Sequence, residues 1–184
     1  MPKKGPMILN IPNTLTIFRI FLVPIFIYLV VKDRMHTATV VFIAAGVTDA
    51  IDGFIARAFN QRTEFGANID PLADKLLLSG AFIVLTIKGF VPLWLCVPVI
   101  IRDFILLSGV IMLRGSGRKV VIAPSIFGKL TTFLQILTVV YALVFSHRTG
   151  EMAFLSLAAM TALVTVYTGF DYARREFRIQ FRQG

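Results

Sequence analysis

The sequence predicts an all-α integral membrane protein whose six transmembrane helices form one bundle. Its 184 residues are 57% hydrophobic and only 16% charged, which is too apolar for an ordinary soluble domain of this size. Apolar runs near the ~20 residues that cross a bilayer recur along the chain. The connections between these runs are short, so we expect a single membrane domain over residues 1–184.

The first three expected spans cover 15–31, 37–59 and 70–88. The first run is not a cleaved signal peptide, because Arg19 interrupts it and no small-residue cleavage pattern follows before Lys32. The second and third runs read as antiparallel helices joined by a short loop. Each of them carries two aspartates, which an apolar span does not need for its own stability.

The last three expected spans cover 91–113, 125–146 and 152–172. Arg102 and Asp103 interrupt the fourth span. After the sixth span, phenylalanines and arginines alternate at roughly helical spacing in FDYARREFRIQFRQG. This pattern favours a short amphipathic helix on an anionic membrane surface, although a solubilising tail would look similar. The opening MILNIPNTLTIF has a similar interfacial character, so we expect short interfacial helices at both termini.

The net charge of +9 invites a nucleic-acid partner, but its distribution argues against one. Lysines and arginines are sparse in the loops on one side of the six-span layout and frequent on the other. Basic residues in short loops mark the cytoplasmic side. We therefore expect both termini in the cytoplasm, membrane lipids as partners and no nucleic acid.

Two pairs of aspartates flank the loop between the second and third spans. Asp49 and Asp52 are three residues apart, and Asp70 and Asp74 are four apart, so each pair shares one helix face. A carboxylate within a membrane costs about 3 kcal/mol, and four repel one another unless cations neutralise them. Oxygen ligands without His or Cys favour Mg²⁺ or Mn²⁺ over zinc. Alternatively, the aspartates accept hydrogen bonds from neighbouring helices or pair with basic residues nearby.

Small residues and an arginine follow the first pair. Gly53 and Ala56 leave a shallow floor where a ligand can approach the backbone, although small residues also serve helix packing. Arg57 carries a planar, always-charged fork that matches a phosphate group. Metal ions, a small-residue floor and an arginine together favour a site for a diphosphate.

These residues resemble the CDP-alcohol phosphotransferase family, whose members carry D-x-x-D-G-x-x-A-R, about eight further residues and then G-x-x-x-D-x-x-x-D. The chain fills every fixed position, with Asp49, Asp52, Gly53, Ala56, Arg57, Gly66, Asp70 and Asp74. The family's six-span layout extends the resemblance over nearly the whole chain.

The resemblance implies a metal-dependent transfer from a CDP-linked lipid to an alcohol, with two Mg²⁺ or Mn²⁺ ions. It makes Asp49, Asp52 and Asp70 metal ligands and makes Asp74 both a ligand and the base that deprotonates the alcohol. It also implies a homodimer in a bacterial-type inner membrane, with the active site facing the cytoplasm. The implied donor-nucleotide residues are Gly53, Ala56, Arg57, Thr63, Asn13 and Thr16.

Polar residues in the second half of the chain are candidates for binding the acceptor. A charged residue inside a span is a functional hypothesis by default. Several cations near one site favour an anionic acceptor, although Arg102 could pair with Asp103 and Lys129 could snorkel at a helix end. The acceptor candidates are Arg102, Arg118, Lys129 and Gln135.

The segment GKLTTFLQ resembles a G-K-x-x-T-x-x-Q segment of the phosphatidylglycerophosphate synthase subgroup, which favours sn-glycerol 3-phosphate as the acceptor. That subgroup usually has Arg-Glu at residues 102–103. Arg-Asp at this place, with AGVTDAIDGFIAR, resembles the cardiolipin synthases, whose acceptor is phosphatidylglycerol. An inositol phosphate is a third candidate acceptor.

A different class of function is also considered. An intramembrane acid cluster is typical of a divalent cation transporter as well. The clustering of the acids towards one membrane face favours the transferase.

Overall fold

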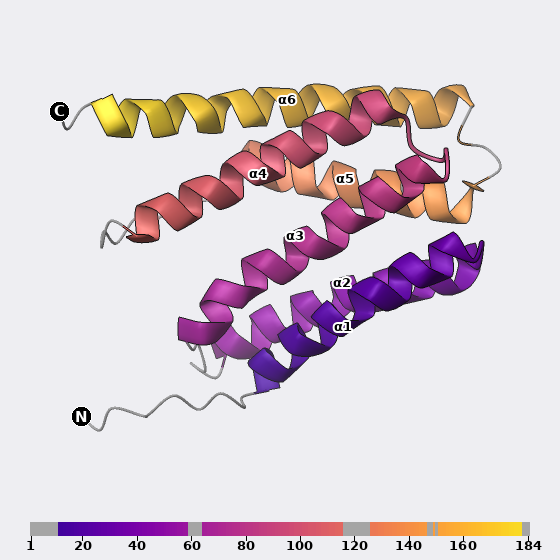
Figure 1. The fold of residues 1–184 in the computed structure, drawn as a ribbon, viewed down its shortest axis with the longest axis horizontal. Helices are drawn as coiled ribbons and strands as arrows, with labels where there is room; N and C mark the ends of the chain where they lie inside the picture. The colour runs from indigo at the N-terminus through magenta and orange to yellow at the C-terminus, as the bar shows by residue number, and fades with distance from the viewer. Residues whose placement is uncertain (1–10, 59–63, 116–125, 147–148, 150, 182–184) are drawn as a thin grey trace. The chain divides into compact units, whose positions relative to one another are not determined.

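The structure is a computed structural model that describes residues 11–58, 64–115, 126–146, 149 and 151–181. Within these ranges all the regular secondary structure is helical, as the sequence predicts (Figure 1). The helices are α1 (Ile11–Val31), α2 (Met35–Ala58), α3 (Glu64–Ile87), α4 (Leu93–Gly115), α5 (Ile126–Val144) and α6 (Met152–Phe181).

The helix bounds follow the expected spans, except that α1 and α3 begin earlier and α6 ends later. Helix α1 begins at Ile11 rather than at residue 15. Helix α3 begins at Glu64 rather than at residue 70, so Asp70 lies in its second turn. Helix α6 continues without a break to Phe181. The arginine-rich tail therefore forms the last turns of α6 rather than a helix of its own, and its location at a membrane surface stays a prediction. Residues 1–10 lie outside the described part of the chain.

The chain divides into two compact units, Met1–Val84 and Leu85–Gly184. In the first unit α1 packs against α2, and the rings of Phe26 and Phe42 meet with centroids 5.6 Å apart. Helix α3 meets α1 at Gly80, where an added Cβ would stand 3.7 Å from Ile27 Cδ1 and 3.8 Å from Val23 Cγ1. The buried apolar residues of this unit are Leu22, Phe26, Val30, Ala38, Phe42, Ala45, Ala73, Leu77, Leu78, Ala81, Phe82 and Val84.

The reversal between α1 and α2 depends on a left-handed residue at the end of α1. Asp33 has a φ of 56°, and the amide of Arg34 donates to the carbonyl of Leu29 over 2.9 Å. This six-residue return is a Schellman motif, which satisfies carbonyls that the helix end would leave without donors. The motif lets α2 start within three residues and run antiparallel to α1.

In the second unit, α4 and α5 both pack against α6. Aromatic pairs fix α5 to α6 near both ends of α5: Phe127 with Tyr167 at 5.3 Å and Tyr141 with Phe154 at 5.6 Å between ring centroids. Apolar side chains from all three helices fill the space between them. The buried ones include Leu95, Val99, Leu134, Val139, Ala142, Leu143, Phe154 and Ala158.

Two of the described helical segments, Ile126–Val144 and Met152–Tyr172, are long and apolar enough to cross a membrane. Shorter apolar segments lie at Thr16–Val31, Met35–Thr48 and Lys75–Ile87. Large apolar side chains such as Phe133, Leu163 and Val166 are also exposed on these helices, as expected where lipid replaces water. The full six-span layout stays a prediction.

Candidate functional site

The two aspartate pairs lie at matching heights beside the connection between α2 and α3. Asp52 is six residues before the end of α2, and Asp70 is six residues after the start of α3, which places both about 9 Å from the helix ends. Asp49 and Asp74 are nine and ten residues from the same ends, or about 14 Å. Only residues 59–63 separate the two helices. The helical backbone therefore keeps each pair on one face and sets the pairs level with each other.

The type and placement of these residues fit a divalent-cation site. Four carboxylates at two matching levels offer oxygen ligands, which hard ions such as Mg²⁺ and Mn²⁺ prefer. Their side chains lie outside the described part of the structure, as do those of Gly53, Ala56 and Arg57 in the last turns of α2. Among the side chains that are described, no group of three or more His, Cys, Asp or Glu could hold a metal ion.

Helix α1 brings Thr16 to the level of the aspartates. Because α1 and α2 are antiparallel, residues equally far from the Phe26–Phe42 contact stand at the same height. Thr16 is ten residues before Phe26, and Asp52 is ten residues after Phe42. The Thr16 side chain is 1% exposed, so it faces the packed interior. Asn13 lies in the first turn of α1 with its side chain outside the described residues, and Thr63 lies outside them altogether.

The second unit contains a buried ion pair on α4. Arg102 Nη1 donates to Asp103 Oδ1 over 2.8 Å, and the two residues are 4% and 2% exposed. The stem of Arg102 lies against α6, because a Cβ added to Gly169 would stand 3.6 Å from both Cβ and Cγ of Arg102. This is an ordinary contact distance, so the arginine stem packs directly over Gly169.

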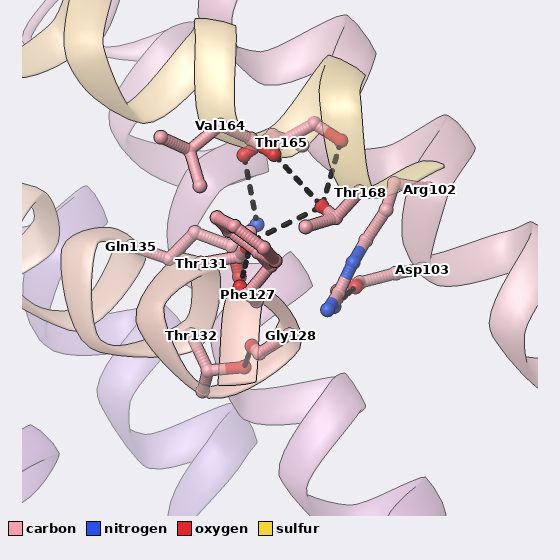
Figure 2. Close-up of polar contacts among 10 residues, drawn as sticks. All are labelled: Arg102, Asp103, Phe127, Gly128, Thr131, Thr132, Gln135, Val164, Thr165 and Thr168. Atoms are coloured by element: carbon pink, nitrogen blue, oxygen red, sulfur yellow. Dashed lines mark hydrogen bonds and ion pairs between the residues drawn. The ribbon is translucent and has the colours of Figure 1, made fainter. Parts of the chain in front are cut away.

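A ladder of polar side chains joins α5 to α6 beside this pair (Figure 2). The hydroxyls of Thr131 and Thr168 are hydrogen bonded at 3.1 Å, and Gln135 Nε2 donates to Thr165 Oγ1 over a long 3.5 Å. One turn further, Thr138 and Thr161 are hydrogen bonded at 2.9 Å. The ladder fixes the antiparallel register of the two helices, and its members are buried.

Among the residues that the structure describes, two buried atoms in this region have no hydrogen-bond partner. They are Arg102 Nε, on α4, and Gln135 Oε1, on α5. A buried polar atom without a partner is destabilising, so such atoms often mark a place where a ligand or water binds. The guanidinium therefore keeps a donor that Asp103 does not use, and the amide keeps an acceptor.

The structure thus separates the predicted acceptor residues into different environments. Arg102 and Gln135 are buried in the second unit, while Lys129 is exposed in the first turn of α5. Arg118 lies outside the described residues. The exposure of Lys129 suits the snorkelling position considered from the sequence as well as a contact with a ligand at the helix end.

The sequence interpretation missed the threonines of the α5–α6 ladder and the burial of Arg19. A single threonine within an apolar run gives no indication of a polar contact, and this holds for Thr131, Thr165 and Thr168. Their spacing was the available signal, because polar residues three or four apart form a stripe on one helix face. Arg19 was noted only as an interruption of an apolar run, yet it is 0% exposed in the structure.

A sequence model of one family, described as CDP-alcohol phosphatidyltransferase, matches residues 9–168. A "Probable phosphatidylglycerophosphate synthase" of Mycobacterium tuberculosis H37Rv is 37% identical over 180 residues, covering 93% of this chain and 83% of the relative. The "CDP-diacylglycerol--glycerol-3-phosphate 3-phosphatidyltransferase" of Bacillus subtilis is 36% identical, covering 89% of this chain and 93% of the relative. Its namesake in Escherichia coli K12 is 34% identical, with 89% and 92% covered.

Proposed function

The chain belongs to the CDP-alcohol phosphatidyltransferase family, and from this premise we propose that it transfers the phosphatidyl group of CDP-diacylglycerol to sn-glycerol 3-phosphate and releases CMP. The observation that carries this proposal is the similarity to relatives that are named for this reaction, at 34–37% identity over most of both chains. Names of this kind favour the enzyme over the cation transporter considered from the sequence.

The donor site is proposed at the aspartate pairs of α2 and α3. Asp49, Asp52, Asp70 and Asp74 would hold two Mg²⁺ or Mn²⁺ ions, which when bound supply positive charge to the donor diphosphate and to departing CMP. Arg57 would bind the diphosphate through its planar fork, one turn beyond Asp52. Gly53 and Ala56 would leave space for the nucleotide, and Asn13, Thr16 and Thr63 would close its pocket.

Asp74 is proposed as the base of the reaction. It would accept the proton of the acceptor hydroxyl, whose oxygen then attacks the phosphorus that carries diacylglycerol. The bond from that phosphorus to the CMP oxygen breaks, and CMP leaves in line with the attack. This is a direct transfer, in which no protein side chain becomes covalently attached to the lipid.

The acceptor phosphate is proposed to bind in the second unit. Arg102 supports this assignment because Asp103 orients the guanidinium through Nη1, while Nε has no partner among the described residues. Gln135 offers an unused amide oxygen, which could accept from a hydroxyl of the glycerol. Arg118 and Lys129 would add positive charge towards the phosphate.

One observation favours a second acceptor. Asp103 stands where the phosphatidylglycerophosphate synthase subgroup usually has glutamate, and the Arg102–Asp103 pair resembles the cardiolipin synthases. Phosphatidylglycerol is therefore the alternative acceptor.

An acceptor screen tests the proposal. The purified protein, labelled CDP-diacylglycerol and Mg²⁺ would be incubated with glycerol 3-phosphate, phosphatidylglycerol, inositol phosphate or serine, and the product would be identified by mass. Phosphatidylglycerophosphate is the expected product. Cardiolipin would overturn the acceptor assignment, and no CMP release with any alcohol would overturn the activity.

The proposal places the reaction in a membrane, and the apolar segments and the lipid-linked donor support this location. The inner leaflet of a bacterial-type cell membrane is the proposed location, with both termini and the donor site towards the cytoplasm. It follows from the excess of lysine and arginine in the loops on that side. A homodimer is proposed from the family resemblance alone.

A further inference from the structure

Helix α1 contains an arginine for which the proposed reaction has no role. Arg19 is 0% exposed, although it lies within a segment whose buried neighbours Leu22 and Phe26 are apolar. A buried charge is strongly destabilising unless an opposite charge and hydrogen bonds compensate it. The position of Arg19 relative to the other helices of the first unit identifies the charges that can do so.

The contact between α1 and α2 places Arg19 level with Asp49. The rings of Phe26 and Phe42 meet between these antiparallel helices. Arg19 is seven residues before Phe26, and Asp49 is seven residues after Phe42. Both residues therefore lie about 10 Å along the helix axis from the ring contact, in the same direction.

An independent contact, between α1 and α3, places Arg19 level with Asp74. Gly80 stands against Val23 and Ile27, so its height corresponds to the middle of that turn of α1. Helices α1 and α3 run in the same direction, because α2 reverses the chain between them (Figure 1). Asp74 is six residues before Gly80, and Arg19 is six residues before the middle of the Val23–Ile27 turn.

The helical angles show that Arg19 lies on the face of α1 between its two neighbours. At about 100° per residue, Arg19 is about 20° around α1 from Phe26, which contacts α2. It is about 40° from Val23, which contacts α3, and Val23 lies on the other side of it. Arg19 therefore lies between the stripe of α1 that contacts α2 and the stripe that contacts α3.

We propose that Arg19 is the fixed counter-charge of the aspartate cluster: a positioning residue that offsets the repulsion between Asp49 and Asp74 and keeps them in place until cations bind. This inference rests on the proposed metal site, and it gives α1 a role in that site. Because the guanidinium cannot lose its proton, the compensation persists when no ion is bound. Bound cations and Arg19 then compete in part for the same carboxylates.

A double-mutant cycle tests this role. Arg19→Gln, Asp49→Asn and the double variant would be compared with the unaltered protein by thermal unfolding in detergent, once with EDTA and once with Mg²⁺. In EDTA, Arg19→Gln should lower Tm on the order of 10 °C, because it leaves carboxylates without a counter-charge. The loss should be at most half as large in Mg²⁺, and the double variant should recover part of it in EDTA.

Additive losses that are the same in EDTA and in Mg²⁺ would overturn the inference, because they would make Arg19 a packing residue only. If Arg19→Gln yields no folded protein, folding recovered in the double variant supports the pairing, and continued failure overturns it. Arg19→Lys keeps the charge and should stay closer to the unaltered Tm than Arg19→Gln. Arg34→Gln, an exposed site in the α1–α2 turn, is the control and should change Tm little.

A second measurement tests the inference through metal affinity, which should rise in the variant whose Tm falls. Mn²⁺ titration followed by electron paramagnetic resonance should show binding several-fold tighter in Arg19→Gln, because a competing cation has been removed. Weaker binding would overturn the inference. Neither readout requires turnover, so a failed acceptor screen would leave this inference standing, and additive Tm losses would leave the proposed reaction standing.

Discussion

The guanidinium of Arg102 and the carboxylate of Asp103 form a 2.8 Å ion pair, although the two residues are neighbours on one helix and both are buried. Successive side chains on a helix diverge, so this contact requires the two side chains to lean towards each other. The surroundings hold it there, with Gly169 of α6 against its stem. The pair fixes the direction of the guanidinium N–H groups that Asp103 does not use. Substitutions at Arg102 and at Gly169 therefore test whether these groups bind the acceptor phosphate.

Replacement of Arg102 should affect the acceptor selectively. Arg102→Gln removes a charged donor, so KM for glycerol 3-phosphate should rise about 10-fold or more while KM for CDP-diacylglycerol stays within about twofold. Steady-state assays with each substrate varied in turn measure both constants. Arg34→Gln serves as the control, and equal increases in both constants would mean that the acceptor phosphate binds elsewhere.

The space above Gly169 offers a matched pair of substitutions. Gly169→Ala adds a Cβ at an ordinary contact distance from the Arg102 stem, so acceptor KM should change less than about twofold. Gly169→Leu adds three further carbons and should displace the stem, raising acceptor KM nearly as much as Arg102→Gln does. If the leucine variant folds and keeps its acceptor KM, Gly169 does not position Arg102.

The threonine pair one turn beyond the proposed acceptor site should affect stability without affecting turnover. Thr138→Val and Thr161→Val each remove one member of a 2.9 Å hydrogen bond. Each should lower the free energy of unfolding by about 0.6 kcal/mol, the average for such bonds in membranes. Unfolding in SDS measures this, and the double variant should lose less than the two single losses added together. Purely additive losses would mean that the hydroxyls contribute independently.

Asp74→Asn should separate binding from chemistry. The amide has nearly the same shape as the carboxylate but cannot take the acceptor proton, so kcat should fall about 100-fold or more. Binding of CDP, measured by isothermal titration with Mg²⁺ present, should weaken far less. Turnover at the unaltered rate would exclude Asp74 as the base. Asp33→Asn, in the α1–α2 turn, controls for the loss of an aspartate elsewhere.

The sequence predicted the helices well because apolar runs and short polar connections determine them directly. It placed the start of α3 too late, because Gly66 and Asn68 within Glu64–Ile69 are residue types typical of loops. The continuation of α6 to Phe181 was missed because the pattern of its last residues is ambiguous. An alternation of phenylalanine and arginine fits a helix on a membrane surface as well as one that extends the last span.

The candidate site was predictable in its residue types but not in its packing. The spacing of the aspartates implied two pairs, and the bounds of α2 and α3 set those pairs level with each other. The burial of Arg19 could not be inferred from α1 alone, because it depends on where α2 and α3 contact that helix. For the same reason the partners of Gln135 became visible only once α5 and α6 were in register.

The central claim is that aspartates from two helices hold the same ions. Mn²⁺ binding in the presence of CDP, followed by electron paramagnetic resonance, tests it most directly. Asp52→Asn on α2 and Asp70→Asn on α3 should each lower the affinity of the same set of bound Mn²⁺ ions at least about 10-fold. The double variant should lose no Mn²⁺ ions beyond that set. Full Mn²⁺ binding after either substitution, or separate populations lost from each helix, would contradict the claim.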